Sequence, residues 1–336
     1  MSNNLESDFW CITEEDFDST KQLESESQFR LCNGHICQQA NFEEYFSGKT
    51  MLGSYISGIS NIEKPENESW KNEFSACTHK IVNAPNWIGI IVRLNDDRLD
   101  LATWEVQNFR RVLNMRAGFL ERTFDAVSTK DRHIQVTVKR MLSMAETEVG
   151  AITYSVKSIN FEGRISFMPI LDGDLKDQLL NENEPIWNVL QTKTQQDVAH
   201  LWVHIRRTDF HVCTALTYVL YKNNEQLHII PAKIEKEKVA GFSTGTDVKK
   251  GDTLCLNKYV AIITSLNHPK NELTELACNL ARAAKQKGWN KLFEEHAAAW
   301  NEKWTEQESN IFDNTQSQQI DRYKIFRKLQ GFDRND

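Results

Sequence analysis

The chain has 336 residues, and 40% of them are hydrophobic, so it can bury a sizeable core, which argues against bulk disorder. Its 47 acidic and 40 basic residues leave a net charge of −7, which argues against a nucleic-acid-binding surface. No run approaches the roughly 20 apolar residues that cross a bilayer, so no membrane partner is expected.

The first segment, residues 1–28, is predicted to be a polar N-terminal arm. Residues 1–19 are acidic and contain no apolar stretch of the kind that a signal peptide requires. Seven cysteines are widely spaced without a Cys-x-x-Cys pair, which argues against a zinc site or a disulfide framework. Reduced thiols fit a cytoplasmic protein, so we expect that location and no bound metal.

Residues 29–268 are predicted to form a β domain, because short apolar stretches alternate with polar residues and end at turn residues. The expected strands include residues 134–138, 152–156, 165–167, 201–205, 212–218 and 254–263. Turn signals recur at Asn95-Asp96-Asp97, Asp172-Gly173-Asp174, Asn223-Asn224 and Lys250-Gly251-Asp252. Strands at this spacing are typical of a sandwich or a barrel, and the length favours two large packed antiparallel sheets. The fold class is therefore mostly β.

Residues 269–306 are predicted to be a helical linker made of two helices. Apolar residues recur at helical spacing from Leu273 to Ala284, and Gly288 is expected to end the first helix. A second stripe, spaced by three and four, consists of Trp289, Phe293, His296, Trp300 and Trp304. Three tryptophans on one face bury a large area, so the second helix must dock on a substantial surface.

The last segment, residues 307–336, is polar at first and then offers one more amphipathic stretch. Ile320, Tyr323 and Phe326 would share one face of a short helix. Such a face needs a partner, and only a charged tail follows it. We therefore expect these residues to be the beginning of a further domain that the chain does not contain.

The densest motif of the chain lies at residues 33–48, which combine glycines, amides and two adjacent carboxylates. It resembles the opening motif of the glycoside hydrolase family 65 phosphorylases, a family that includes maltose, kojibiose and trehalose phosphorylases. The residues that match the family pattern are Asn33, Gly34, Ala40, Asn41, Glu43 and Glu44. Two residues depart from it, since Cys37 replaces a glycine and Gln39 replaces an arginine.

Further segments are similar to the family in the same order. They are Gly53-Ser54-Tyr55, Asn83-Ala84-Pro85-Asn86-Trp87, Phe109-Arg110-Arg111, Leu171-Asp172-Gly173-Asp174 and the helical Glu295-His296-Ala297-Ala298-Ala299-Trp300. The resemblance covers about residues 29 to 326. It implies a galactose-mutarotase-like super-β-sandwich followed by linker helices and, after residue 326, an (α/α) barrel whose pattern this chain lacks.

The resemblance also implies a reaction, the inverting phosphorolysis of an α-glucosidic disaccharide with inorganic phosphate as co-substrate and no other cofactor. The family's catalytic acid and phosphate pocket lie in the barrel, so we expect no catalytic residue here and no activity from this chain alone. A separately encoded barrel domain is then the expected partner, and the family suggests a homodimer. Which disaccharide the parent enzyme used stays open.

The paired carboxylates Glu43 and Glu44 are weak candidates for the catalytic acid. Neighbouring side chains of an extended segment point in opposite directions, so the two cannot act on one bond. We expect instead that Asn41, Glu43, Glu44 and Tyr55 form an interface with the barrel domain.

A second set of candidates could contact a sugar. His200, Trp202, His204 and Arg206 alternate onto one face of a predicted strand, where they could stack on a sugar ring or support aldose-epimerase chemistry. The alternative is a solvated sheet face. Trp87 could be a sugar platform or could cap a core edge. Three functions therefore stay open: a part of a phosphorylase, a stand-alone carbohydrate-binding module, and an epimerase-like enzyme.

Overall fold

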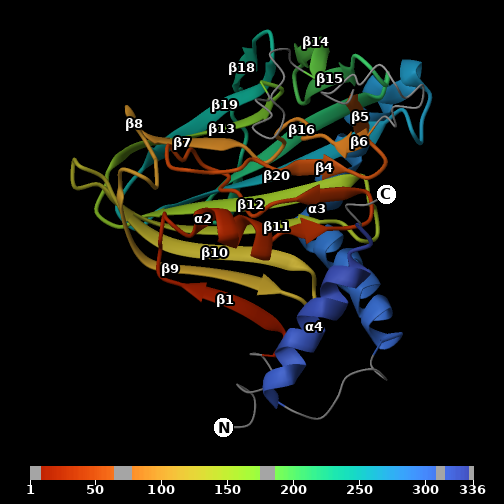
Figure 1. The fold of residues 1–336 in the computed structure, drawn as a ribbon. Helices are drawn as coiled ribbons and strands as arrows, with labels where there is room; N and C mark the ends of the chain where they lie inside the picture. The colour runs from red at the N-terminus through yellow and green to blue at the C-terminus, as the bar shows by residue number, and fades with distance from the viewer. Residues whose placement is uncertain (1–8, 64–77, 175–185, 308–314, 333–336) are drawn as a thin grey trace, which may run out of the picture.

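The structure is a computed structural model that describes residues 9–63, 78–174, 186–307 and 315–332 (Figure 1). Its helices are α2 (Gln22–Gln28), α3 (Leu273–Thr305) and α4 (Thr315–Leu329), with a 3-10 turn at Lys270–Glu272. The strands up to residue 114 are β1 (Cys11–Glu15), β2 (Leu31–Cys32), β3 (Ile36–Gln38), β4 (Ser54–Ile56), β5 (Ser60–Glu63), β6 (Thr78–Ile81), β7 (Ile90–Leu94), β8 (Asp97–Arg98) and β9 (Glu105–Asn114). The later strands are β10 (Phe119–Val127), β11 (His133–Leu142), β12 (Val149–Ser158), β13 (Gly163–Asp172), β14 (Trp187–Thr194), β15 (Ala199–Ile205), β16 (His211–Lys222), β17 (Glu225–Leu227), β18 (Ala232–Glu235), β19 (Val239–Val248) and β20 (Thr253–Thr264).

The main layer is an antiparallel sheet of ten strands within the described residues. Its order is β1-β9-β10-β11-β12-β20-β16-β15-β14, and β17 pairs with β16 at its side. The strands alternate buried and half-buried residues, as β10 does along its whole length, because successive side chains point to opposite faces. The turn predicted at Asn223-Asn224 has left-handed backbone at both residues. The strands predicted from the sequence are confirmed.

A second sheet covers one face of the large sheet and closes the core. Its order is β18-β19-β13-β7-β8. Tyr154 of the large sheet meets Phe167 of the second sheet edge to face, with ring centroids 5.8 Å apart. Phe124, Val136 and Phe242 are fully buried in the same cluster. The mostly β sandwich predicted from the sequence is therefore confirmed.

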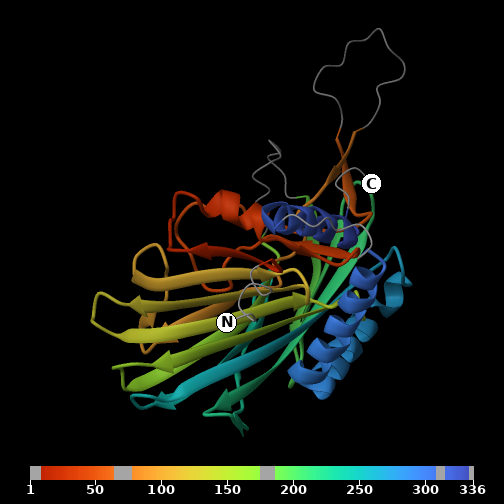
Figure 2. The same ribbon diagram turned by 90° about the horizontal axis from the view of Figure 1, so that it is seen from below.

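Helix α3 covers the other face of the large sheet, where it packs on β16 and β20 (Figures 1 and 2). The helical direction is interrupted at Gly288, whose φ of 77° is outside the helical region. The two predicted linker helices are thus present and meet at the predicted glycine. The stripe of the second half docks as expected, because Trp300 and Trp304 are buried. Trp300 lies over Gly118, where an added Cβ would lie 1.8 Å from the indole nitrogen.

The N-terminal segment is more ordered than the sequence predicts. Residues 11–15 form β1, which pairs with β9 at the edge of the large sheet, from Cys11 opposite Asn114 to Glu15 opposite Arg110. Residues 22–28 form α2, and Glu26 of this helix is fully buried. The expectation of a loose arm is therefore wrong for residues 9–28, because polar side chains there bond to the body of the domain.

Helix α4 packs against this N-terminal segment (Figure 2). Phe326 is fully buried, and its ring stacks on Trp300 with centroids 4.8 Å apart. Gln319 donates a hydrogen bond to the Cys11 carbonyl at 2.7 Å, and the Tyr323 hydroxyl donates to the Gln28 carbonyl at 2.9 Å. Ile320 stays 55% exposed. The apolar face of the helix therefore finds most of its partner within the domain.

One disulfide corrects the sequence analysis. Cys32 and Cys37 lie directly opposite each other on β2 and β3, and the structure joins them in a disulfide. The tight turn between the two strands brings together cysteines that spacing alone did not pair. Disulfides persist in oxidising compartments, so this pair does not support the expectation of reduced thiols, and the cytoplasmic location stays a prediction. None of the described helices has the length and apolarity to cross a membrane.

Candidate functional site

The opening motif begins with a turn that one side chain organises. The Asn33 side-chain oxygen accepts hydrogen bonds from the main-chain N–H groups of His35 and Ile36 at 3.2 and 2.9 Å. Its amide nitrogen donates to the carbonyls of Ser143 and Thr147 at 2.7 and 2.9 Å. Gly34 supplies the left-handed backbone that the turn needs, with a φ of 86°. Asn33 and Gly34 therefore fix how β2 and β3 sit on the large sheet.

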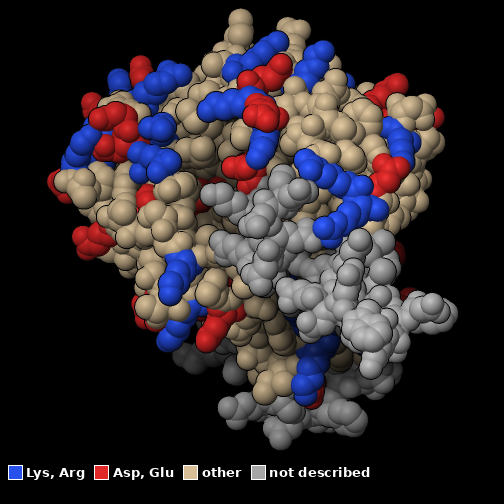
Figure 3. Space-filling view, turned by 45° about the horizontal axis from the view of Figure 1, so that its top comes forward, with Lys and Arg blue, Asp and Glu red and all other residues tan. Residues whose placement is uncertain are grey.

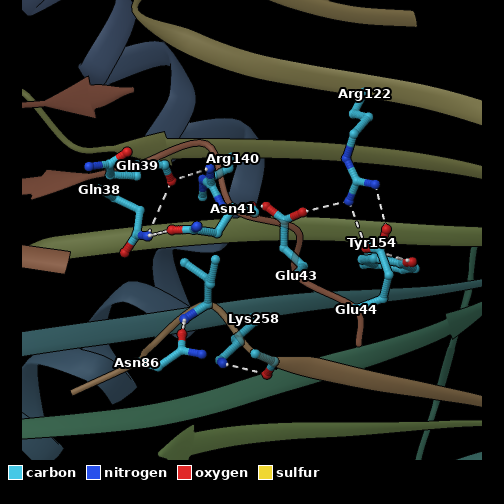
Figure 4. Close-up of polar contacts among 12 residues, drawn as sticks. Gln38, Gln39, Asn41, Glu43, Glu44, Asn86, Arg122, Arg140, Tyr154 and Lys258 are labelled. Atoms are coloured by element: carbon cyan, nitrogen blue, oxygen red, sulfur yellow. Dashed lines mark hydrogen bonds and ion pairs between the residues drawn. The ribbon is translucent and has the colours of Figure 1, made fainter. Parts of the chain in front are cut away.

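The carboxylate of Glu43 lies between two arginines of the large sheet (Figure 4). Its oxygens lie 2.7 Å from Arg140 of β11 and 2.8 Å from Arg122 of β10. Burial alone would raise the pKa of Glu43, but the charges of Arg140 and Arg122 hold this pKa below its ordinary value. Glu43 is therefore ionised, and the two guanidinium groups balance its negative charge inside the domain.

Glu44 bends back to the same arginine. Both of its oxygens bond to Arg122, one of them at 2.6 Å, and the Tyr154 hydroxyl donates to it at 3.2 Å. Although burial opposes it, the charge of Glu44 raises the pKa of Arg122. The guanidinium carbon of Arg122 also lies 4.5 Å from the Phe42 ring centroid, in a cation–π contact.

The expected orientation of the two carboxylates is therefore wrong. The chain bends at residues 43–44 instead of running as a strand, and both side chains converge on Arg122. Each glutamate is only 4% exposed. A carboxylate held by arginines and closed to solvent is not available to protonate a substrate.

Asn41 and Tyr55, the other two predicted interface residues, are also buried within the domain. Asn41 donates to the Met51 carbonyl at 2.9 Å and accepts from the Gly53 N–H at 3.1 Å. Tyr55 packs against the Cys32–Cys37 pair. Arg140 adds bonds to the carbonyls of Asn41 and Gln39. The network thus tethers the opening loop to the sheet, and a contact of these residues with another domain stays a prediction.

A buried lysine lies on the same side of the sheet and was not predicted from the sequence. Lys258 of β20 is fully buried, and its ammonium nitrogen donates to the carbonyls of Gly89 and Ile170 at 3.0 and 2.8 Å. Burial lowers the pKa of Lys258 well below its ordinary value. The Lys258 side chain therefore joins two main-chain carbonyls in the interior, where solvent does not reach it.

Trp87 is not a sugar platform in this structure. It is fully buried, and an added Cβ at Gly150 would lie 2.8 Å from its ring. The surrounding sheets close over the indole, so no ligand can stack on it. Trp87 is therefore part of the hydrophobic core.

Helix α3 covers one end of the predicted β15 face and leaves the other end open. His200 is 1% exposed, with one ring nitrogen 2.9 Å from the Gln191 side-chain oxygen and the other 3.6 Å from the Cys278 sulfur of α3. Burial lowers the pKa of His200 and raises that of Cys278, so the pair is neutral and the thiol is not activated. Trp202 packs against the cluster under the same helix. Neither a solvated sheet face nor an epimerase site fits this end of the strand.

The other end of that face is more open. Arg206 is exposed and donates to the Asn188 side-chain oxygen at 2.6 Å. His204 approaches the Asn188 amide nitrogen at 3.2 Å and stacks on His211 of β16. Within the described ranges, three side chains of types that can bind a metal lie close together here, namely His204, Asp209 and His211.

An open hollow of about 160 Å³ lies elsewhere on the surface, beside β16 and β17. Its lining combines an aromatic ring with polar side chains, namely Tyr218, Gln226, His228, Asp197 and Lys285. Such a mixture can hold a small polar ligand.

On the face shown in Figure 3, basic and acidic side chains are interspersed, which agrees with the balanced composition.

Comparison with known proteins identifies the kind of chain to which this architecture belongs. The sequence profile described as "Glycosyl hydrolase family 65, N-terminal domain" matches residues 12–303. The chain is 26% identical to a maltose phosphorylase of Bacillus subtilis (strain 168), over 96% of this chain and 42% of that protein. It is 25% identical to an alpha,alpha-trehalose phosphorylase of Thermoanaerobacter brockii, over 97% of this chain and 43% of that protein.

A solved structure agrees with these matches. A candidate kojibiose phosphorylase from human microbiome superposes with a TM-score of 0.84 at 21% identity, over 96% of this chain and 42% of that one. The fold is therefore shared along nearly the whole chain. The chain spans less than half the length of the curated relatives that it matches.

Proposed function

This chain belongs to the glycosyl hydrolase family 65 N-terminal domain family, and from that membership we propose that it is the β-sandwich part of a disaccharide phosphorylase. In this proposal the sandwich works together with a catalytic domain and does not cleave a disaccharide by itself. The relatives that support it are named as maltose, trehalose and kojibiose phosphorylases. The chain matches less than half of each of them.

One observation carries the non-catalytic role. The two adjacent carboxylates of the opening motif, Glu43 and Glu44, are buried and bonded to Arg122 and Arg140. Inverting phosphorolysis needs an acid that protonates the glycosidic oxygen while phosphate attacks from the opposite face. An ionised carboxylate enclosed by guanidinium groups has no proton to give. The motif instead stabilises the sandwich on which a catalytic domain would rest.

The test is a phosphorolysis assay on the purified 336-residue chain. Maltose, trehalose and kojibiose are each incubated with inorganic phosphate, and released sugar 1-phosphate is measured. We expect no product above a protein-free control. Product would contradict the proposal, and Asp172→Asn would then be the first variant to assay, because burial raises the pKa of Asp172 toward that of an acid catalyst.

The proposed partner can be tested separately. The part of the Bacillus subtilis maltose phosphorylase that this chain does not match is expressed alone and mixed with the chain. We expect co-elution in size-exclusion chromatography and an increase in maltose phosphorolysis over either component. Sedimentation of the chain alone then shows whether it is also a homodimer.

The hollow beside β17 favours a second candidate function, the binding of a small sugar. Tyr218 offers a ring, and Gln226 and Lys285 offer hydrogen-bonding groups around it. Calorimetry with maltose, trehalose and kojibiose tests this function. Binding that is lost in Gln226→Ala and kept in Gln191→Ala, outside the hollow, would support it. Absence of heat with all three sugars would contradict it.

A further inference from the structure

We propose that the hairpin of β15 and β16 carries a binding site for a borderline divalent cation such as Zn²⁺, formed by His204, Asp209 and His211. One ligand atom from each residue lies within 4.8 Å of the other two. All three residues belong to a single hairpin and its connecting turn. The site is independent of the proposed phosphorylase role.

The geometry of the sheet brings the two histidines together. His204 and His211 are directly opposite in the antiparallel register of β15 and β16. Side chains at opposite positions lie on the same face, and these imidazoles stack with centroids 5.3 Å apart and 24° between their planes. The pair therefore needs no long-range rearrangement to present two ring nitrogens to one ion.

The turn supplies the third ligand. Asp209 has left-handed backbone, with a φ of 54°, and its main-chain N–H donates to the Ile205 carbonyl at 2.9 Å. This conformation returns its carboxylate to His211, whose Nε2 lies 2.9 Å from an Asp209 oxygen. The carboxylate thus lies beside the imidazole pair at the open end of the β15 face.

The ring nitrogens are available to an ion. The Nδ1 atoms of His204 and His211 are buried and have no hydrogen-bond partner within the described residues. The other ring nitrogen of His204 lies 3.2 Å from the amide nitrogen of Asn188, so this side chain has to turn its oxygen toward the ring before His204 can bind an ion through Nδ1.

The donor set selects the metal. Two imidazoles and one carboxylate suit Zn²⁺, Ni²⁺ or Cu²⁺, whereas Mg²⁺ prefers oxygen ligands and retains its water. Bond lengths of about 2.1 Å place tetrahedral ligand atoms roughly 3.4 Å apart. Side-chain rotations that move each ligand atom by about an ångström would therefore bring the three atoms to binding distance. A bound ion would join the two strands to the turn at this end of the sheet.

One neighbour opposes the ion. Lys270, at the start of the helical region, forms an ion pair with the second oxygen of Asp209. Its ammonium group competes with a metal for the carboxylate and adds positive charge beside the site. Removal of this lysine should therefore strengthen metal binding, an effect that a random surface site would not show.

The test is calorimetric titration of the full, tag-free chain with ZnCl₂ and, in parallel, with MgCl₂. We expect one Zn²⁺ per chain at micromolar concentrations and no binding of Mg²⁺ under the same conditions. His204→Gln and His211→Gln should each weaken Zn²⁺ binding by at least about tenfold, and Lys270→Gln should strengthen it. The matched control is His228→Gln, an exposed histidine outside the group, which should leave binding unchanged.

Circular dichroism and thermal melting establish that each variant is folded. Zn²⁺ binding that persists in both histidine variants, or that appears only at millimolar concentrations in the wild-type chain, would overturn the proposal. Electron paramagnetic resonance of the wild-type chain with one equivalent of Cu²⁺ needs no variant. It should show hyperfine coupling to imidazole nitrogens, and a spectrum of oxygen ligands alone would likewise overturn the site.

Discussion

The indole ring of Trp300 stacks on the ring of Phe326, with the two ring planes 25° apart. This contact joins the second half of α3 to α4 across a break in the described chain. It lies in the main hydrophobic cluster, together with Phe29 and Leu31 near the N-terminus. The terminal helix is thereby part of the same packed body as the sandwich.

Phe326→Ala should therefore destabilise the whole domain. The change removes a fully buried ring and leaves a cavity beside Trp300, which costs about 3–5 kcal/mol of unfolding free energy. Urea unfolding followed by tryptophan fluorescence measures this cost. Ile320→Ala on the same helix is the matched control, and its change should stay within about 0.5 kcal/mol because the side chain is exposed. Equal effects of the two variants would contradict the packing described.

Arg122→Met should be strongly destabilising, because it leaves Glu44 buried without its cation. Loss of one partner of a buried ion pair costs about 3–5 kcal/mol of unfolding free energy. The additional change Glu44→Leu removes the stranded charge and should recover much of that loss. Lys139→Met is the control, because its pair with Glu121 is about one-third exposed and should matter by less than about 1 kcal/mol. No recovery in the double variant would show that the arginine acts mainly through its packing.

His296 should make the domain sensitive to mild acid. Its Nδ1 accepts from the Met144 N–H at 3.0 Å, and its Nε2 lies 3.1 Å from the Gly118 carbonyl, so the ring is held neutral. Burial lowers the pKa of His296 to about 4 from an ordinary 6.5. Between these values the unfolded chain binds the extra proton, so stability falls as the pH decreases from 6.5 toward 4.

The measurement is the unfolding free energy of the wild-type chain and of His296→Gln at several pH values in that window. Glutamine can accept and donate in the same two directions without titrating. The wild-type chain should lose about 3 kcal/mol more than the variant across the window. His228→Gln should behave as the wild type does, and parallel curves for the wild type and His296→Gln would refute the assignment.

Lys258 should make the unfolding free energy depend on pH at neutral to alkaline values. Its pKa is far below that of an exposed lysine, so the unfolded chain binds more protons than the folded chain up to a pH of about 10.4. Stability relative to Lys258→Met should therefore rise as the pH increases from about 7 to about 9.5. Lys233→Met, on the exposed strand β18, is the control. A relative stability that does not change with pH would contradict the lowered pKa of Lys258.

Much of the fold could be predicted from the sequence because it depends on local periodicity. The strands at 134–138 and 152–156 have one buried face, so their apolar residues alternate, and both form as predicted. Gly288 marks the change in direction of α3 for a similarly local reason, since its backbone leaves the helical region. Residues 9–28 were missed because their order depends on distant partners. The Gln22 side chain, for example, bonds to Arg111 of β9.

The candidate site was less predictable, because its key contacts join residues far apart in sequence. Trp87 and His200 have the right chemistry for a sugar, but only the packed structure shows that sheets and α3 close over them. One signal could have located the arginine network. Arg122 alternates with Leu120 and Phe124, all three on the buried side of β10, and an arginine at a core position needs buried carboxylates nearby.

Helix α4 also determines how the domain responds to force. Gln319 and Tyr323 bond to main-chain carbonyls at Cys11 and Gln28, close to the beginning of the described chain. A load applied at residue 332 would pass through these contacts into β1 and α2, through the Phe326–Trp300 stack into α3, and from β1 into its hydrogen bonds with β9. The two ends of the described chain are thus mechanically coupled, and a load is shared between the edge strand of the large sheet and α3.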